Sequence, residues 1–467
     1  MRGLVAIAVL MPGVALACAL PPSILLTLPT GHYIAGAAAT VAVTGLLAAA
    51  PQWLPRLGAR TLMTRRVLVP QVVSSSLSFL VFLTLLMIGF FGARDPLHNL
   101  LTLAVWTGLW VALPMAIVVF GNLWRPLNPW TGPVRIARIL LGRTTSVGVS
   151  RLGYWPAVAG LFGFFWFYRV SMSPDDPQTL ATVALVYWLV IFVLAVADGE
   201  EWLTSGEFLT VYMTWLAKIA PFWLEVTGKT AHLRIGWPGS QVLALPALTP
   251  SAVGFVTLAL AGLTFDGLAE TFWWLALIGE NPLEFTGRSA VIWVNTAGLL
   301  GTWALTSVTI LAALQLSTVL AAGPEMATAT GGLKAGDLAS SQADLRPVLL
   351  SFLAIAAGYH AAHYLMTLLT TGQYTLAALN DPLFRGDAFL GLSPFFVSMG
   401  FLTERGMVTA IWTAQFALIL GAHVLALILA LRLSGPHVPA RAHLPLTGLM
   451  VGYTVLGLWL LSAPRGF

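Results

Sequence analysis

Ten apolar segments dominate this sequence and limit its fold more than any other feature. They cover residues 32–50, 71–92, 100–121, 152–170, 181–198, 250–278, 290–320, 347–371, 405–431 and 444–463. A helix of about 20 apolar residues crosses the hydrocarbon core of a bilayer. The chain is 58% hydrophobic and only 9% charged, whereas soluble domains carry about 25% charged residues. We therefore predict an all-α, polytopic transmembrane helix bundle with about 10–11 spans.

The N-terminal residues 1–19 form one further apolar segment, which has two interpretations. A single Arg2 precedes the apolar stretch, and Ala17 and Ala19 flank Cys18, as at the small-residue cleavage site of a signal peptide. The alternative is an uncleaved first transmembrane helix. Residues 20–467 are predicted to form one membrane domain. Because Cys18 is the single cysteine, the chain has no internal disulfide and no metal site built from several cysteines.

The distribution of Lys and Arg predicts the orientation of the helices. Loops 51–70, 122–151, 199–249, 321–346 and 432–443 hold 16 of the 23 basic residues. Basic loops face the cytoplasm, so these loops are predicted to be cytoplasmic and the C-terminus to lie outside. The net charge of +5 is thus explained by orientation, and we predict no nucleic-acid partner.

Three loops have compositions that suggest a role. Residues 121–140 combine a Pro-rich turn with a basic amphipathic segment, which predicts an interfacial anchor on anionic lipid. Residues 201–224 are predicted to form a second interfacial helix. The long, partly apolar loop 372–404 lies outside and directly after the helix 347–371, so we predict that it folds over the bundle as a lid.

Two pairs of ionisable side chains lie inside apolar segments. His360 and His363 are three residues apart, and Asp266 and Glu270 are four apart, so each pair shares one helix face. Counting about 1.5 Å per residue from the outer end of each segment places these four side chains and Gln415 in one layer, near the midplane on the outer side. Intramembrane ionisable residues are costly and commonly functional.

Two imidazoles with carboxylates at one depth can bind a divalent metal, and zinc accepts both ligand types. We predict His360, His363 and Asp266 as ligands of a divalent metal such as zinc, which would lower the pKa of its bound water to about 7. Glu270 is then the general base or a fourth ligand.

Other polar side chains complete this predicted site. Gln415 is a contact to substrate or to a ligand, and Tyr359 or Tyr364 donates to developing negative charge. His423 falls near the inner face, outside the cluster or hydrogen-bonded structurally. Interhelical hydrogen bonds are the alternative explanation for any single buried polar group.

Several motifs in order along the chain resemble a family of bacterial polytopic membrane proteins, the fenitrothion hydrolase subunits. They include GNLWRPLNPW, TFDGL, YHAAHY, NDPLFRGDAFLG and GAHVLAL. The resemblance implies an inner-membrane component that hydrolyses organophosphorus esters, working with a second, similar subunit. By position it carries over Asp266, His360, His363 and His423.

We predict a membrane-embedded, metal-dependent hydrolase of organophosphorus or similar apolar esters. The main alternative is a proton- or metal-coupled transporter that uses the same Asp, Glu and His cluster. A haem-b electron carrier is a third hypothesis, although His360 and His363 on one face cannot ligate a haem from opposite sides. A receptor or assembly subunit without chemistry is the fourth.

Overall fold

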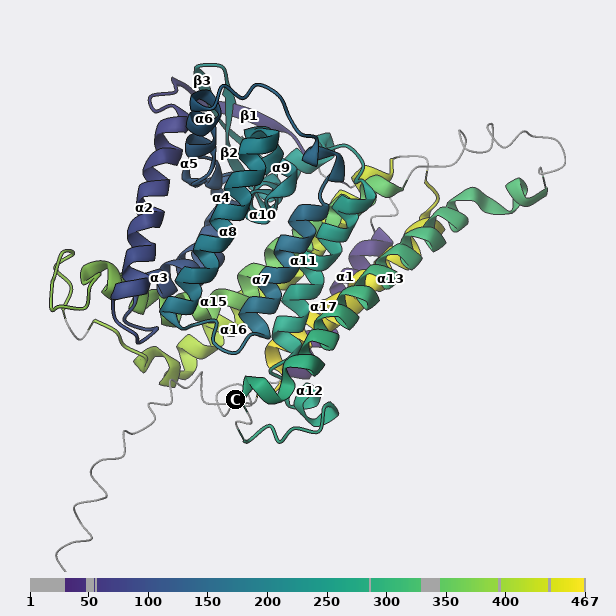
Figure 1. Ribbon diagram of the computed structural model, residues 1–467. Helices are drawn as coiled ribbons and strands as arrows, with labels where there is room; N and C mark the ends of the chain where they lie inside the picture. Colours follow the sequence, from purple (N-terminus) through teal and green to yellow (C-terminus); the bar gives the residue numbers. More distant parts are fainter. Residues whose placement is uncertain are drawn as a thin grey trace, which may run out of the picture.

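The computed structural model describes residues 30–47, 54, 57–284, 287–328, 345–393, 396–435 and 438–465. It confirms the all-α helix bundle (Figure 1). Within this part of the chain, eight helices are long and apolar enough to cross a membrane. They are α2 (Gln71–Phe91), α3–η3–α4 (Leu100–Phe120), α8 (Pro177–Asp198), α11 (Pro250–Leu268), the Arg288–Ala322 part of α13 (Arg288–Thr328), η9–α15 (Arg346–Asn380), α16 (Arg405–Ser434) and η11–α17 (Ala440–Ser462). The predicted signal peptide or first helix at 1–19 lies outside the described residues.

The other two predicted segments are helical but shorter. Segment 32–50 forms α1 (Thr30–Leu47), which packs on α17, and segment 152–170 forms α7 (Trp155–Arg169), which packs on α11. The 15 residues of α7 rise about 22 Å, less than the hydrocarbon core of about 30 Å. All ten apolar segments are therefore helices of the bundle, and eight have the length of a full span.

The segment 250–278 is not one continuous helix. α11 ends at Leu268, and a short α12 (Phe272–Leu277) follows. The break is stabilised by Thr271, whose hydroxyl accepts a hydrogen bond from the backbone N–H of Trp274 as an N-cap. Our depth count assumed an unbroken helix, so it placed Asp266 and Glu270 too far from the outer end. Asp266 instead lies in the last turn of α11, and Glu270 lies in the turn that follows.

A three-stranded antiparallel sheet covers one end of the bundle, at the top of Figure 1. Its order is β1 (Ala59–Arg66), β3 (Thr230–Gly236) and β2 (Phe222–Thr227), and the turn Gly228-Lys229 joins β2 to β3. The sequence predicts loops at these residues. Because the sheet pairs residues of loops 51–70 and 199–249, it places two predicted cytoplasmic loops at the same end.

The predicted interfacial helix at 201–224 is wrong. The residues form α9 (Leu203–Gly206), α10 (Phe208–Leu216) and η6 (Ala217–Ile219) before β2 begins, and α10 is buried on almost every side. The helix carries apolar residues on all its faces, which is typical of a helix in the protein core. The completely buried Glu207 caps its N-terminus by accepting hydrogen bonds from the N–H groups of Leu209 and Thr210.

Residues 121–140 form α5 (Trp124–Leu127) and α6 (Thr131–Leu140). Thr210 of α10 anchors this region, because its hydroxyl oxygen accepts hydrogen bonds from Trp124 Nε1 and Asn128 Nδ2. α6 exposes Ile139 and Leu140 beside its arginines. The segment is amphipathic as expected, and lipid binding stays a prediction.

The predicted lid begins later than residue 372, because α15 (Phe352–Asn380) continues through the first part of it. The backbone N–H groups of Arg385 and Gly386 donate to the Asp381 carboxylate and fold the following loop on itself. Phe384 packs against the ring of His98, with ring centroids 4.2 Å apart. The loop therefore contacts His98, and its role as a lid stays a prediction.

Candidate functional site

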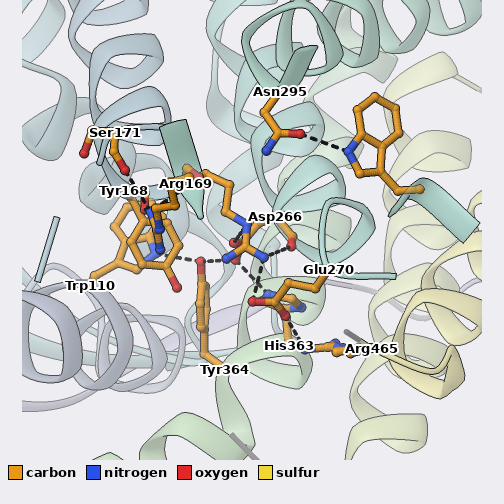
Figure 2. Close-up of polar contacts among 12 residues, drawn as sticks. Trp110, Tyr168, Arg169, Ser171, Asp266, Glu270, Asn295, His363, Tyr364 and Arg465 are labelled. Atoms are coloured by element: carbon orange, nitrogen blue, oxygen red, sulfur yellow. Dashed lines mark hydrogen bonds and ion pairs between the residues drawn. The ribbon is translucent and has the colours of Figure 1, made fainter. Parts of the chain in front are cut away.

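Two carboxylates and two guanidinium groups meet at the end of the bundle opposite the sheet (Figure 2). Arg169, the last residue of α7, lies 3.3 Å from Asp266 (Nε to Oδ1) and 2.6 Å from Glu270 (Nη2 to Oε1). Arg465, just beyond α17, contacts the second Glu270 oxygen at 3.3 Å. The four charges balance. The Asp266 side chain is 3% exposed and that of Glu270 is 38% exposed, so the cluster runs from the bundle interior to an accessible edge.

α15 contributes two further side chains to Asp266. Asp266 Oδ2 accepts hydrogen bonds from His363 Nε2 at 2.8 Å and from the Tyr364 hydroxyl at 2.8 Å. The Tyr364 oxygen in turn accepts a hydrogen bond from Trp110 Nε1 at 2.9 Å. With Asp266 ionised, the His363 proton is assigned to Nε2. The other nitrogen, Nδ1, is buried and has no hydrogen-bond partner in the described structure.

The unpartnered His363 nitrogen lies beside the backbone of Gly267. A Cβ atom at position 267 would lie 3.0 Å from the Tyr359 hydroxyl and 3.7 Å from His363 Nδ1. The Tyr359 and His363 rings are stacked, with centroids 5.7 Å apart. The Tyr359 hydroxyl also lacks a partner among the described residues. The backbone of Gly267 thus lies close to two unpartnered polar groups.

His360 does not share a ligand position with His363, contrary to our prediction. Its Nε2 donates to the backbone oxygen of Trp110 at 2.9 Å, and its Nδ1 accepts from the Tyr212 hydroxyl at 2.9 Å. Trp110 belongs to the π-helical segment η3 (Ala104–Ala112), and π-helical turns frequently mark functional sites. His360 is 1% exposed and fully satisfied as a neutral imidazole.

The side chains do not fit the zinc site that we predicted. In the part of the chain that the structure describes, no three His, Cys, Asp or Glu side chains come together as metal ligands. Both nitrogens of His360 are hydrogen-bonded within the protein. Both Asp266 oxygens are occupied, by Arg169 on one side and by His363 and Tyr364 on the other. Glu270, predicted as base or fourth ligand, is held between two arginines.

Gln415 and His423 do not join the charged cluster. Gln415 Nε2 donates to the backbone oxygen of Ala362 at 2.9 Å, which ties α16 to α15. His423 Nδ1 donates to the oxygen of Ile419 at 2.8 Å, and its Nε2 has no partner among the described residues. Both side chains are buried. Gln415 thus has a structural contact, and His423 has one nitrogen free for another group.

Sequence reasoning missed Arg169 and Arg465, which lie outside the five basic loops. A signal was present, because two carboxylates at the end of an apolar segment require cations nearby. It also missed Trp110 and Tyr212, the partners of Tyr364 and His360. Nothing in their spacing distinguishes them from other aromatic residues of a membrane helix.

The chain matches no known family model, no curated protein and no solved structure. Its function is therefore argued from the site alone.

A cavity close to the cluster, lined in part by Tyr359 and His423, has a volume of about 10 Å³. Pockets for drug-sized ligands measure about 300–1,000 Å³.

Proposed function

We propose that the protein translocates protons across the membrane as a permease, and that His363 and Asp266 carry the proton. The observation that supports this most is the buried His363–Asp266 pair with His363 Nδ1 unpartnered. Ionisable groups inside a membrane protein commonly form proton relays. The alternative metal-dependent chemistry has less support, because the donor atoms it needs are already paired with protein groups.

The residues divide this work according to their contacts. Nδ1 of His363 accepts the proton, and the Asp266 carboxylate compensates the positive charge that the imidazole gains. Tyr364 holds the carboxylate in place from the other side. Arg169 connects Asp266 to Glu270, so a change of charge at the buried pair alters the ion pairs at the accessible edge. Glu270 is the group that exchanges protons with the outer aqueous phase.

Proton influx into proteoliposomes tests this function. A potassium gradient with valinomycin imposes an inside-negative potential, and trapped pyranine reports the internal pH. We expect influx with the wild-type protein and only the rate of protein-free liposomes with His363→Gln or Asp266→Asn. His98→Gln changes a partly exposed imidazole at the same end of the bundle and is expected to keep the wild-type rate.

Two results would contradict the proposal: wild-type influx no faster than in protein-free liposomes, or unchanged influx in His363→Gln. Each variant must elute as a monodisperse peak and show wild-type helicity, so that lost influx is not lost folding. Asp266→Glu, which keeps the charge, is a second variant in which influx should be partly retained.

A hydrolase acting on organophosphorus or similar apolar esters is the second candidate. A carboxylate that orients a histidine with one free nitrogen is the arrangement of a general base, and the motif resemblance agrees with it. His363 Nδ1 would take a proton from the water that attacks phosphorus, without a metal. The cavity that Tyr359 and His423 line has a volume of about 10 Å³ and is too small for such an ester, so we place this function second.

Release of p-nitrophenol from a paraoxon-type ester tests the hydrolase function. The hydrolase function predicts release by purified wild-type protein, alone or with a similar membrane subunit, and none by His363→Gln. Release that is equal in both proteins would eliminate His363 as the base.

We further propose a bacterial inner-membrane location with the C-terminus outside, supported by the grouping of basic loops at the sheet end of the bundle. In a Cys18→Ser background, Asp387→Cys should react with a membrane-impermeant maleimide in intact spheroplasts. Lys229→Cys, in the sheet turn, should react only after permeabilisation. The reverse pattern would invert the topology.

A further inference from the structure

Three buried polar atoms near the junction of α11, α15 and α16 lack hydrogen-bond partners in the described structure: Tyr359 Oη, His363 Nδ1 and His423 Nε2. A buried polar atom left unpaired costs about 1–3 kcal/mol, and such atoms usually bind ordered water. Tyr359 and His363 are one turn apart on α15. Tyr359 directly follows Gly358, whose backbone approaches Ala422 of α16. His423 therefore lies at the same close crossing of two helices as Tyr359.

A single cavity connects Tyr359 with His423. Its volume is about 10 Å³, and a site for one water molecule needs about 10–15 Å³ and two to four polar partners. Its polar lining consists of Tyr359, His423, Thr264 and Tyr453, and the remaining lining residues are aliphatic or glycine.

Two of these polar residues can still accept a hydrogen bond. The Thr264 hydroxyl donates to the Leu260 oxygen at 2.8 Å, and the Tyr453 hydroxyl donates to Thr306 at 3.1 Å. In the described structure, each of these two oxygens donates one hydrogen bond and accepts none. Both can therefore accept a hydrogen bond from a water molecule. A water in this cavity has enough partners to be bound stably.

We propose that this cavity binds one water molecule, and that the water extends the proton route from the His363–Asp266 pair to His423. The water donates to His423 Nε2, because His423 Nδ1–H is committed to the Ile419 oxygen. It accepts from the Tyr359 hydroxyl and donates its second hydrogen to Thr264 or Tyr453. His363 Nδ1 and the Tyr359 hydroxyl both lie beside the backbone of Gly267, and the proton passes between them when the two groups move into hydrogen-bond contact.

One proton moves along this route from His363 to His423. The groups between these two histidines end in the protonation state in which they began. The His363 imidazolium releases the proton on Nδ1, and the Tyr359 oxygen accepts a proton while its own hydroxyl proton passes to the water. The water passes one of its protons to His423 Nε2. His363 ends neutral, His423 ends as an imidazolium, and Tyr359 and the water are restored. His423 is therefore the inner proton acceptor of the route.

The water site and the proton route are tested separately, since only the route rests on the proposed function. X-ray radiolysis in H₂¹⁸O generates hydroxyl radicals from bound water, which label adjacent side chains with ¹⁸O. We expect labelling of Tyr359 in the intact protein. Tyr212 is the control, because it is also buried but its hydroxyl is bonded to His360. His423→Phe removes the acceptor and fills the cavity, and it should abolish the labelling of Tyr359.

Proton influx in the proteoliposome assay then tests the route. Tyr359→Phe removes one oxygen and is expected to slow influx to the rate of His363→Gln. Labelling of Tyr359 no stronger than that of Tyr212 would overturn the water site. Labelling together with wild-type influx in Tyr359→Phe, while His363→Gln is inactive, would overturn the route and leave the proposed function standing. Absence of influx in the wild type would refute the proposed function, and the labelling result would still decide the water site.

Discussion

The ion pairs Arg169–Asp266 and Arg94–Asp176 have the same N–O distance of 3.3 Å and differ in burial. The side chains of the first pair are 12% and 3% exposed, and those of the second are 61% and 26% exposed. Breaking a buried pair costs about 3–5 kcal/mol because one charge stays uncompensated. An exposed pair contributes about 0.2–1 kcal/mol. The two pairs therefore allow the cost of burial to be measured within one protein.

We expect Arg169→Gln and Asp266→Asn each to lower the free energy of unfolding by about 3–5 kcal/mol. Arg94→Gln should lower it by less than about 1 kcal/mol. The double variant Arg169→Gln/Asp266→Asn removes both charges, so its loss should be smaller than the sum of the single losses by about 0.5–3 kcal/mol. Helicity followed during SDS titration in mixed micelles measures these values.

Two outcomes would refute this reasoning. The first is an Arg169→Gln variant as stable as Arg94→Gln, which would mean that water reaches the pair and screens it. The second is a double variant whose loss equals the sum of the single losses, which would mean that the two side chains do not interact.

Three further results follow from individual contacts. Tyr212→Phe leaves His360 Nδ1 unpaired and should lower the free energy of unfolding by about 1–3 kcal/mol, whereas proton influx should stay at the wild-type rate. Gly358→Ala places a Cβ against Ala422 and should lower the free energy of unfolding by about 1–3 kcal/mol through overpacking. Gly421→Ala is the control, because its Cβ would meet no atom within 4 Å. Thermal unfolding in detergent compares the two variants. Elemental mass spectrometry of purified protein should find no stoichiometric zinc, and EDTA should leave influx and thermal stability unchanged; one bound zinc per chain that is lost in His363→Gln would contradict the site described above.

The helices could be predicted from the sequence because their signal is local and strong. A run of apolar residues long enough to span a bilayer has few alternatives, and all ten predicted segments are helical. The break after Leu268 was missed because its cap depends on the single hydroxyl of Thr271. The sheet was missed for a different reason, since β1 pairs with β3 across more than 150 intervening residues.

The site was predicted in part. Asp266, His363 and Tyr364 do meet, as the sequence predicted, although the depth assigned to Asp266 was too great. The opposite directions of His360 and His363 were not predictable. A spacing of three residues still separates two directions by about 60°, and this angle is enough for His360 to face Tyr212 while His363 faces Asp266.

The position of Asp266 within its helix indicates that it is not placed for stability. It lies in the last turn of α11, where the helix dipole is negative and a carboxylate is disfavoured. Arg169 compensates both the carboxylate charge and the negative end of the helix dipole. It contacts the Asp266 carboxylate and also donates to the backbone oxygen of Asp266 at 3.2 Å. Well-packed hydrophobic residues of similar volume often match or exceed the stability of a buried ion pair. If the double variant folds, loses less stability than the sum of the two single losses and yet conducts no protons, the charges at these two positions are required for proton transfer.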